Sequence, residues 1–284
     1  MKQHKRSTME DTIAAKNTLT KRVNELAQRA YQNSYVTHTQ FLTAAEQAQF
    51  LEAVGANGID KADVRGLSGQ WKGCIWVMYG GWEEAERRVL CFLPEYLDAE
   101  GLRRQEEEEP EITVCLHVTP VNKRFAEELT HRDFLGALMN LGIERDRIGD
   151  ILVRDAEAFL YVMKENADMI CRELIRVRHT SVSCQMVPPS ACTILPQFEE
   201  QEGSVSSERL DAILAMVYHL SRGKAQELVE QEQVIVDGRT AYSGGYDLKE
   251  GSRVCVRGYG KFQYLGVGAK TRKGRFYARV RLWK

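Results

Sequence analysis

Residues that could bind a phosphate group lie near position 222 of this 284-residue chain. Ser221 is followed by Arg222 and Lys224, and the residues after them have the apolar spacing of a helix. Ser221 is a suitable N-cap, so both cations would lie in the first turn, where the helix dipole is already positive. Cations there cost on the order of 0.3–1 kcal/mol each in stability. Free amides, a positive dipole end and two cations can together receive an anion, and we interpret this helix start as a phosphate site.

Two short helices and a hairpin would position these residues. The segment that begins at residue 207 has apolar residues at the i, i+3, i+4 and i+7 positions of one buried face: Leu210, Ile213, Leu214 and Val217. A second helix follows Ser221. Residues 234–236 are predicted to form a strand that runs into a turn at Asp237 and Gly238.

This stretch resembles the S4 domain, the small RNA-binding domain named after ribosomal protein S4. The residues that carry the resemblance are Arg209, Leu210, Asp211, Ser221, Arg222, Ala225, Leu228, residues 234–238, Leu248, Gly251 and residues 254–258. One departure is that residues 231–233 replace the usual glycine between the second helix and the hairpin. The resemblance implies RNA contacts at Arg209, Ser221, Arg222, Lys224, Asp237, Gly238, Arg257 and Lys261.

Residues farther upstream resemble the bacterial YlmH-type RNA-binding proteins. The matching residues are 131–138, 141–143, 148–153, Trp82 and 85–87, so the resemblance covers most of the chain from about Phe41 onward. It implies a cytoplasmic, non-enzymatic protein without a cofactor, whose partners are ribosomal RNA or tRNA and the large ribosomal subunit. In this family the role is the rescue of stalled nascent chains on peptidyl-tRNA, which is ribosome quality control. A link to cell division is also attached to the family.

The charge distribution indicates a polyanion-binding face in the last third of the chain. Net charge is −1, which by itself argues against nucleic acid. Residues 204–284, however, hold 15 basic and 8 acidic residues, an excess of +7, so the remainder carries −8. A basic terminal module on an acidic body is typical of directed binding to a polyanion, and the acidic part could meet protein partners.

The last residues extend this basic module. Residues 274–284 alternate strictly, so Arg275, Tyr277, Arg279, Arg281 and Trp283 would share one face of a strand. Arginines can neutralise phosphates and aromatic rings can stack on bases. The residues beyond the S4-like core that we expect to contact RNA are Lys270, Arg272, Lys273, Arg275, Tyr277 and Arg279.

The whole chain is predicted to be an α+β protein. Residues 1–72 would form a helical N-terminal domain and residues 73–187 a ferredoxin-like domain, similar to an RNA-recognition motif (RRM) but without its aromatic signature. Residues 188–206 would be a linker, with its hinge in the polar stretch 199–206, and residues 207–284 the S4-like domain. The glutamate run in residues 105–110 is predicted to be a solvated loop. His131 and Arg132 form a possible second RNA surface.

Short motifs also raise enzymatic alternatives. Residues 209–211 are similar to the catalytic triplet of pseudouridine synthases, residues 268–271 to a P-loop, and residues 131–133 to a kinase catalytic loop, but the rest of each motif is absent. We therefore predict no catalytic residues, no small-molecule substrate and no metal. Two alternatives remain open: an RNA-modifying enzyme guided by the S4-like domain, and a cell-division scaffold that binds RNA incidentally.

The remaining composition indicates an intracellular protein. Seven cysteines form no C-x-x-C pair and are expected to be reduced, buried thiols. No apolar run reaches the roughly 20 residues of a membrane span, and no signal peptide is predicted.

Overall fold

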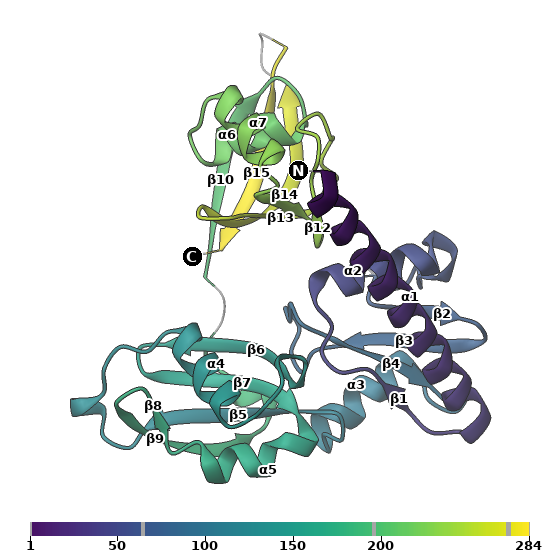
Figure 1. Ribbon diagram of the computed structural model, residues 1–284, viewed down its shortest axis with the longest axis vertical. Helices are drawn as coiled ribbons and strands as arrows, with labels where there is room; N and C mark the ends of the chain where they lie inside the picture. The colour runs from purple at the N-terminus through teal and green to yellow at the C-terminus, as the bar shows by residue number, and fades with distance from the viewer. Residues whose placement is uncertain (1, 64–65, 195–196, 271–273, 284) are drawn as a thin grey trace. The chain divides into compact units, whose positions relative to one another are not determined.

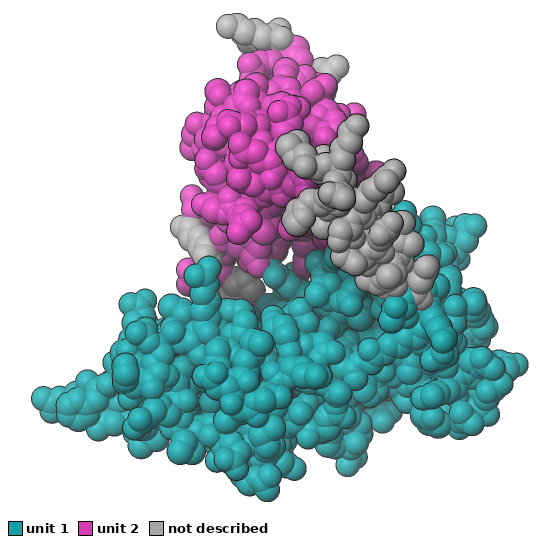
Figure 2. Space-filling model, viewed as in Figure 1, with its two compact units in different colours: residues 1–195 teal, residues 196–284 magenta. Residues whose placement is uncertain are grey.

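The computed structural model describes residues 2–63, 66–194, 197–270 and 274–283, with side chains from residue 18 onward except at 269 and 270. The chain divides into two compact units, residues 1–195 and 196–284 (Figure 2). The predicted α+β class is confirmed, with helices and strands in both units (Figure 1).

The first unit begins with two helices packed on a small sheet. These helices are α1 (Lys2–Asn33) and α2 (Ala44–Val54), the latter opened by a capping box between Thr43 and Glu46. The sheet has the order β1-β4-β3-β2, and its strands are β1 (Thr37–His38), β4 (Val89–Leu93), β3 (Cys74–Tyr79) and β2 (Ser68–Trp71). Phe50 of α2 packs edge-on against Trp76 of β3, with 5.2 Å between ring centroids. The N-terminal region is therefore not purely helical, because β3 and β4, which we expected in the middle domain, complete its core.

The acidic run near residue 106 is helical, contrary to the predicted solvated loop. Helix α3 (Ala99–Glu108) begins at the N-cap Asp98. Glu106 is only 1% exposed, and its carboxylate accepts N–H groups of residues 111–113 at 3.0–3.3 Å. Burial raises the pKa of Glu106 more than these hydrogen bonds lower it. The run of glutamates therefore contains one buried hydrogen-bond acceptor, Glu106, which connects α3 to the start of the following strand.

The middle sheet has the ferredoxin-like arrangement that the sequence predicted. Its elements along the chain are β5 (Thr113–Pro120), α4 (His131–Asn140), β6 (Ile148–Arg154), β7 (Glu157–Met163), α5 (Lys164–Glu173), β8 (Arg176–Val177) and β9 (Thr180–Val187). The sheet order is β6-β7-β5-β9-β8, with every neighbouring pair antiparallel. Both helices pack on one face, where Phe134, Leu138 and Ile170 meet the alternate residues of β5 and β7.

A partly buried carboxylate joins the two sheets of the first unit. Asp150 of β6 accepts the backbone N–H groups of Glu86 and Arg87 at 2.8 and 3.0 Å and the indole N–H of Trp82 at 3.1 Å. The Arg87 guanidinium donates to the carbonyl oxygens of Ile148 and Phe41 at 2.9 and 3.0 Å. The residues around position 86 that carry the family resemblance thus have a structural function, since they fix one sheet against the other.

The second unit is a six-stranded antiparallel sheet with two helices on one face. The helices are α6 (Leu210–Val217) and α7 (Arg222–Glu230). In the order β10-β15-β14-β13-β11-β12, the strands are β10 (Phe198–Val205), β15 (Phe276–Trp283), β14 (Gly260–Lys270), β13 (Arg253–Val256), β11 (Val234–Val236) and β12 (Arg239–Thr240). The other face of this sheet, opposite α6 and α7, is called the outer face below.

Strand β10 corrects the predicted linker and hinge. All eight of its residues pair with β15, from Phe198 opposite Trp283 to Val205 opposite Phe276. Gly203 permits this, because a Cβ atom there would lie 2.4 Å from the Met216 side chain of α6. The polar composition of residues 199–206 favoured a hinge. The segment is an edge strand instead, because every residue of β10 pairs with β15 and Val205 packs in the core.

Candidate nucleic-acid interface

One buried carboxylate holds two of the predicted RNA-binding arginines. Asp211 Oδ2 accepts from Arg222 at 2.8 Å and from Arg209 at 3.2 Å, and Arg209 Nε donates to Oδ1 at 3.3 Å. Burial raises the pKa of Asp211, but the two arginines outweigh it and hold the pKa below its ordinary value. The Asp211 side chain is 8% exposed, whereas each arginine side chain is 46% exposed. Asp211 therefore fixes both guanidinium groups and leaves part of each open to an anion.

A glycine-containing loop sets Asp211 in place. The N–H groups of Leu210 and Asp211 donate to the carbonyl oxygens of Tyr246 and Gly244 at 2.7 and 3.0 Å. A Cβ atom on Gly244 would lie 3.0 Å from Asp211 Cβ and 2.0 Å from the Gln226 amide oxygen. These first amides of α6 are occupied by the loop, so α6 offers its arginine neighbours rather than its own N-terminus.

The start of α7 has the predicted cap and cations. Ser221 Oγ accepts the backbone N–H of Lys224 at 3.1 Å, and Arg222 and Lys224 lie in the first turn. Lys224 Nζ also contacts Glu227 at 2.9 Å, and both side chains are nearly half exposed. The carboxylates of Asp211 and Glu227 offset the dipole cost that the sequence indicated. The cations are thus compatible with a stable helix, and an anion would compete with acidic partners for them.

The predicted turn residues Asp237 and Gly238 shape the hairpin. Both have positive φ values, 47° and 78°, as a two-residue type I′ turn requires. The Asp237 carboxylate accepts the backbone N–H of Arg253 at 2.7 Å. The side chain of Asp237 is therefore used within the fold, and its predicted role in RNA binding remains a proposal.

Arg257 and an unpredicted tyrosine lie at the turn between β13 and β14. Arg257 is exposed, and its backbone N–H donates to the Gln233 carbonyl oxygen at 2.9 Å. Tyr259 is 42% exposed and packs against Tyr218, with 5.3 Å between ring centroids. The Tyr259 hydroxyl contributes, after Glu227, to the raised pKa of Lys224, so it lies near the α7 cations. Its signal in the sequence is an aromatic residue in the same turn as Arg257, although the S4 resemblance assigns no RNA contact to it.

Lys261 lies on the outer face of the sheet rather than beside α7. Its ammonium is 5.2 Å from the centroid of Trp283, and the Arg253 guanidinium is 5.8 Å from the same ring. Phe198 of β10 packs edge-on against Trp283 at 5.3 Å. The outer face therefore carries an aromatic pair flanked by cations, an arrangement that suits a stacked base.

The extension strand β15 is more neutral than the sequence indicated, because β10 brings acidic residues to it. Arg279 and Arg281 stand opposite Glu202 and Glu200, and Arg281 contacts Glu200 at 3.4 Å. The Arg275 guanidinium donates to the Ser204 carbonyl oxygen at 2.6 Å. Counted from residue 196, the second unit holds 15 basic and 11 acidic residues, an excess of +4 in place of +7.

The predicted site residues therefore do not form one face. Arg209, Arg222 and Lys224 lie with the helices, whereas Lys261, Tyr277 and Arg279 lie on the outer face. Ser221 contributes as the cap of α7. Lys270 ends β14, but its side chain, together with Arg272 and Lys273, lies outside the described residues.

In the first unit, His131 and Arg132 are exposed in the first turn of α4. Asp133 forms a capping box with Thr130, as expected for a first-turn acid, and hydrogen bonds from Thr130 lower its pKa. Arg178 approaches Asp133 at 3.8 Å. These contacts account for Asp133 without catalysis, and they leave the proposed RNA contact of His131 and Arg132 as a proposal.

Comparisons with known proteins agree with these two regions. A family model described as "Putative RNA-binding domain in YlmH" matches residues 107–191, and the S4 domain model matches residues 208–254. The Bacillus subtilis (strain 168) protein named "Ribosome-associated protein quality control protein P2" is 30% identical over 201 residues, which are 69% of this chain and 74% of that protein. The chain belongs to the YlmH-type RNA-binding family. A solved structure, "Cell division protein ylmH from Streptococcus pneumoniae", matches over 61% of this chain and 92% of its own chain, with 19% identity and a TM-score of 0.43.

The YlmH-type middle sheet has aromatic residues on the face away from its helices, but they are covered. Phe159 and Tyr161 of β7 face this side, and each is at most 2% exposed. Ile194 and Cys192 pack on them from residues 188–194, here called the covering segment, and Trp82 stacks on Tyr161 at 6.1 Å. The Arg154 guanidinium also donates to Thr193 at 3.3 Å. The face on which an RRM stacks bases is therefore part of the core here.

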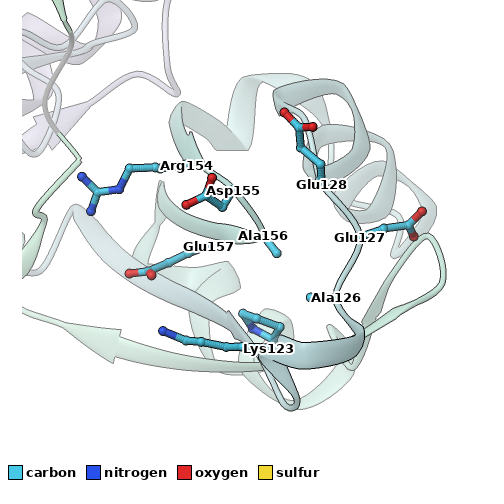
Figure 3. A pocket seen from close by; sticks show the side chains of 9 residues that line it. Lys123, Ala126, Glu127, Glu128, Arg154, Asp155, Ala156 and Glu157 are labelled. Atoms are coloured by element: carbon cyan, nitrogen blue, oxygen red, sulfur yellow. The ribbon is translucent and has the colours of Figure 1, made fainter.

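The cavity at one end of this YlmH-type sheet does not suit a phosphate. It has a volume of about 300 Å³ and is lined by Lys123 and Arg154 but also by four carboxylates (Figure 3). Those carboxylates are Glu127, Glu128, Asp155 and Glu157. Because acidic residues outnumber cations, an anion would be repelled from this cavity.

Three further findings bear on the other predictions. Among the described residues, no group of three or more His, Cys, Asp or Glu side chains could hold a metal ion. All seven cysteines are free, as expected, but only Cys74, Cys91 and Cys115 are buried. The expectation of uniformly buried thiols was wrong, because Cys255 is exposed and Cys171, Cys184 and Cys192 are only partly buried. None of the helices within the described ranges combines the length and the apolar character that a membrane crossing requires.

Proposed function

We propose that this protein is a non-catalytic, cytoplasmic RNA-binding factor that acts on the large ribosomal subunit, with peptidyl-tRNA, in the rescue of stalled translation. The observation that carries the proposal is the pair of half-exposed arginines, Arg209 and Arg222, held by one buried carboxylate beside Lys224. Their position in an S4 domain supports RNA as the anion.

The arrangement favours a structured RNA backbone. Asp211 restricts both guanidinium groups before any ligand arrives, so less side-chain entropy is lost on binding. Arginine forks bind phosphate oxygens in a bidentate manner, which adds orientation to affinity. The protein would act by stabilising one state of a larger complex through differential affinity, without a chemical step.

The name of the Bacillus subtilis relative, a ribosome-associated quality control protein, supports the ribosome as the place of action. The middle domain matches a putative RNA-binding model, but its base-stacking face is covered, so we assign the main RNA affinity to the second unit. Protein partners could meet the acidic first unit.

Binding of the full-length protein to purified 50S subunits at several salt concentrations tests the proposal. If about five phosphates are neutralised, the slope of log affinity against log salt is about −3.5, and affinity falls roughly 100-fold between 50 and 200 mM. The variant R222E/K224E should lose most of this affinity and flatten the slope.

The matched control is K61E/R104E, which reverses two exposed charges in the first unit. Equal losses in both variants would mean that net charge, not the helix start, governs binding. Crosslinking in cells, followed by sequencing of attached RNA, should recover ribosomal RNA or tRNA through the second unit. Recovery of neither, with a cellular phenotype that survives R222E/K224E, would replace this proposal with a scaffold role.

A further inference from the structure

A cavity of about 470 Å³ lies between β10 and α6 in the second unit, next to the arginine pair. Its wall is apolar, with Val205, Ala212, Ala215 and Met216. Small-molecule sites in proteins occupy roughly 300–1,000 Å³ and combine such walls with a few polar groups, so the volume suits a ligand of nucleotide size.

The rim of the cavity is suited to an anion. Arg222 lines it, and besides Asp211 the Arg222 guanidinium approaches Ser206 Oγ at 3.4 Å. Arg275 lines it as well and is fixed by the Ser204 carbonyl oxygen at 2.6 Å. Both arginines are therefore oriented by the fold and reach the same opening from α7 and from the start of β15.

Two other polar residues complete the rim. His219 follows α6 with a positive φ of 52° and is exposed, and Glu202 comes from β10. Glu202 alternates with Gly203, which faces Met216, so its side chain belongs to the outer side of β10 and adds a negative charge beside the opening that disfavours a second phosphate. The cavity thus offers an apolar slot and a cationic opening.

We propose that this cavity takes one unpaired nucleotide of the bound RNA, with the base against Met216 and Ala215 and its phosphate between Arg222 and Arg275. The inference rests on the proposed function, because the RNA backbone would reach the cavity from the Arg209 and Arg222 site. An unpaired nucleotide is the suitable occupant, since extruding a paired base costs a few kcal/mol and a bulged one much less.

Three RNA hairpins test this with the full-length protein: one fully paired, one with a single bulged adenosine and one with an abasic bulge. We expect the bulged hairpin to bind about tenfold more tightly than the other two, as one sequestered base allows. The variant A215F should abolish this preference and leave binding to the paired hairpin within twofold, whereas R275A should abolish the preference and also weaken binding to the paired hairpin, because it removes a cation. K249A, which removes an exposed cation elsewhere in the unit, should keep the preference.

Thermal unfolding establishes that A215F is folded, and R275A carries the test if it is not. Equal affinities of wild-type protein for all three hairpins would overturn this inference and leave the proposed function intact, whereas salt-independent binding of every hairpin would contradict the proposed function itself. Free adenosine monophosphate gives the last arm. If adenosine monophosphate binds saturably, R275A abolishes this binding and the hairpins show no bulge preference, then the cavity takes free nucleotides. That result would overturn the assignment of the cavity to an RNA nucleotide.

Discussion

The middle sheet and the C-terminal sheet are built alike, each with two helices on one face, but their other faces differ. In the middle sheet, Phe159 and Tyr161 lie beneath the covering segment and Trp82. On the outer face of the C-terminal sheet, Tyr277 is 43% exposed, and the ring of Trp283 lies beside Lys261 and Arg253. Aromatic residues on the second face of a sheet therefore indicate a binding surface only when no other part of the fold packs on them.

The charged groups differ in the same way. In the first unit, the buried Glu106 and the partly buried Asp150 accept mainly backbone N–H groups, and the loss of solvent raises the pKa of both. In the second unit, Asp211 is buried against two half-exposed arginines, and its pKa is lowered. One arrangement uses carboxylates to hold backbone segments together, and the other uses a carboxylate to present cations.

The substitution D150A should have the strongest consequence, and it separates the stability of the first unit from RNA affinity. In D150A, two backbone N–H groups and the Trp82 indole lose their acceptor. We expect the unfolding free energy of the first unit to fall by about 3–5 kcal/mol, as when one partner of a buried charged network is removed. Hydrogen exchange should show this loss in residues 1–195, with the second unit and RNA affinity unchanged.

The conservative surface change D168N serves as control, since Asp168 is exposed on α5. A matching loss of RNA affinity in D150A would show that the first unit contributes directly to binding. The assignment of the main RNA affinity to the second unit would then be wrong.

A pair of aromatic substitutions tests the two faces directly. W283L removes a ring that two cations flank on the outer face, and F159L shortens a covered ring of the middle sheet. Because one stacked base contributes about 1–3 kcal/mol, W283L should lower RNA affinity about tenfold or more. F159L should lower stability by about 1 kcal/mol and leave affinity unchanged. The reverse ranking in an RNA-binding titration would mean that the covering segment opens when RNA binds.

The pH dependence of stability should have opposite signs in the two units. Asp211 has a lowered folded pKa, so its contribution is present above the unfolded pKa and is lost as pH falls through the folded value. Glu106 has a raised folded pKa, so its contribution is largest below the unfolded pKa and is lost as pH rises through the folded value.

Denaturant unfolding between pH 3 and 7 tests these signs against the isosteric variants. The stability advantage of wild type over D211N should grow as pH rises through the acid range. The advantage over E106Q should shrink over the same range. Parallel slopes for the two pairs would contradict the assigned environments.

The sequence predicted the parts of this fold that depend on local spacing. The helix faces of Leu210 to Val217, the cap at Ser221, the Asp237 turn and the ferredoxin-like order of the middle domain all follow from periodicity, capping and turn chemistry. Each depends on residues within a few positions of one another.

The errors came from long-range pairing. Strand β10 was predicted to be a hinge because its glutamates and glycine have low strand propensity, but it pairs with β15, whose residues lie 71 to 85 positions later in the chain. That pairing placed Glu200 and Glu202 against the arginines of the extension and reduced its charge. In the same way, the role of Asp211 was missed because a salt bridge to Arg222, 11 positions away, has no signature in spacing. Charge counted along a chain predicts net attraction to a polyanion, but the pairing of strands decides which cations remain available.

The substitution E200Q tests whether the pairing of β10 with β15 decides which cations remain available, and its effect should be small. It removes the carboxylate that contacts Arg281 at 3.4 Å on the outer face. The pair is exposed, so its loss should change the unfolding free energy by less than about 0.5 kcal/mol. RNA affinity should rise about twofold, because a negative charge near the aromatic pair no longer repels phosphate, and this gain should vanish at high salt.

The matched control is E199Q, which removes the same charge from the adjacent residue, whose side chain points to the opposite side of β10. At physiological salt the screening length is about 8 Å, so a charge on the other side of the sheet should have a weaker effect. Equal gains in E199Q and E200Q would mean that RNA responds to the total charge of the unit, and the outer face would then have no separate part in binding.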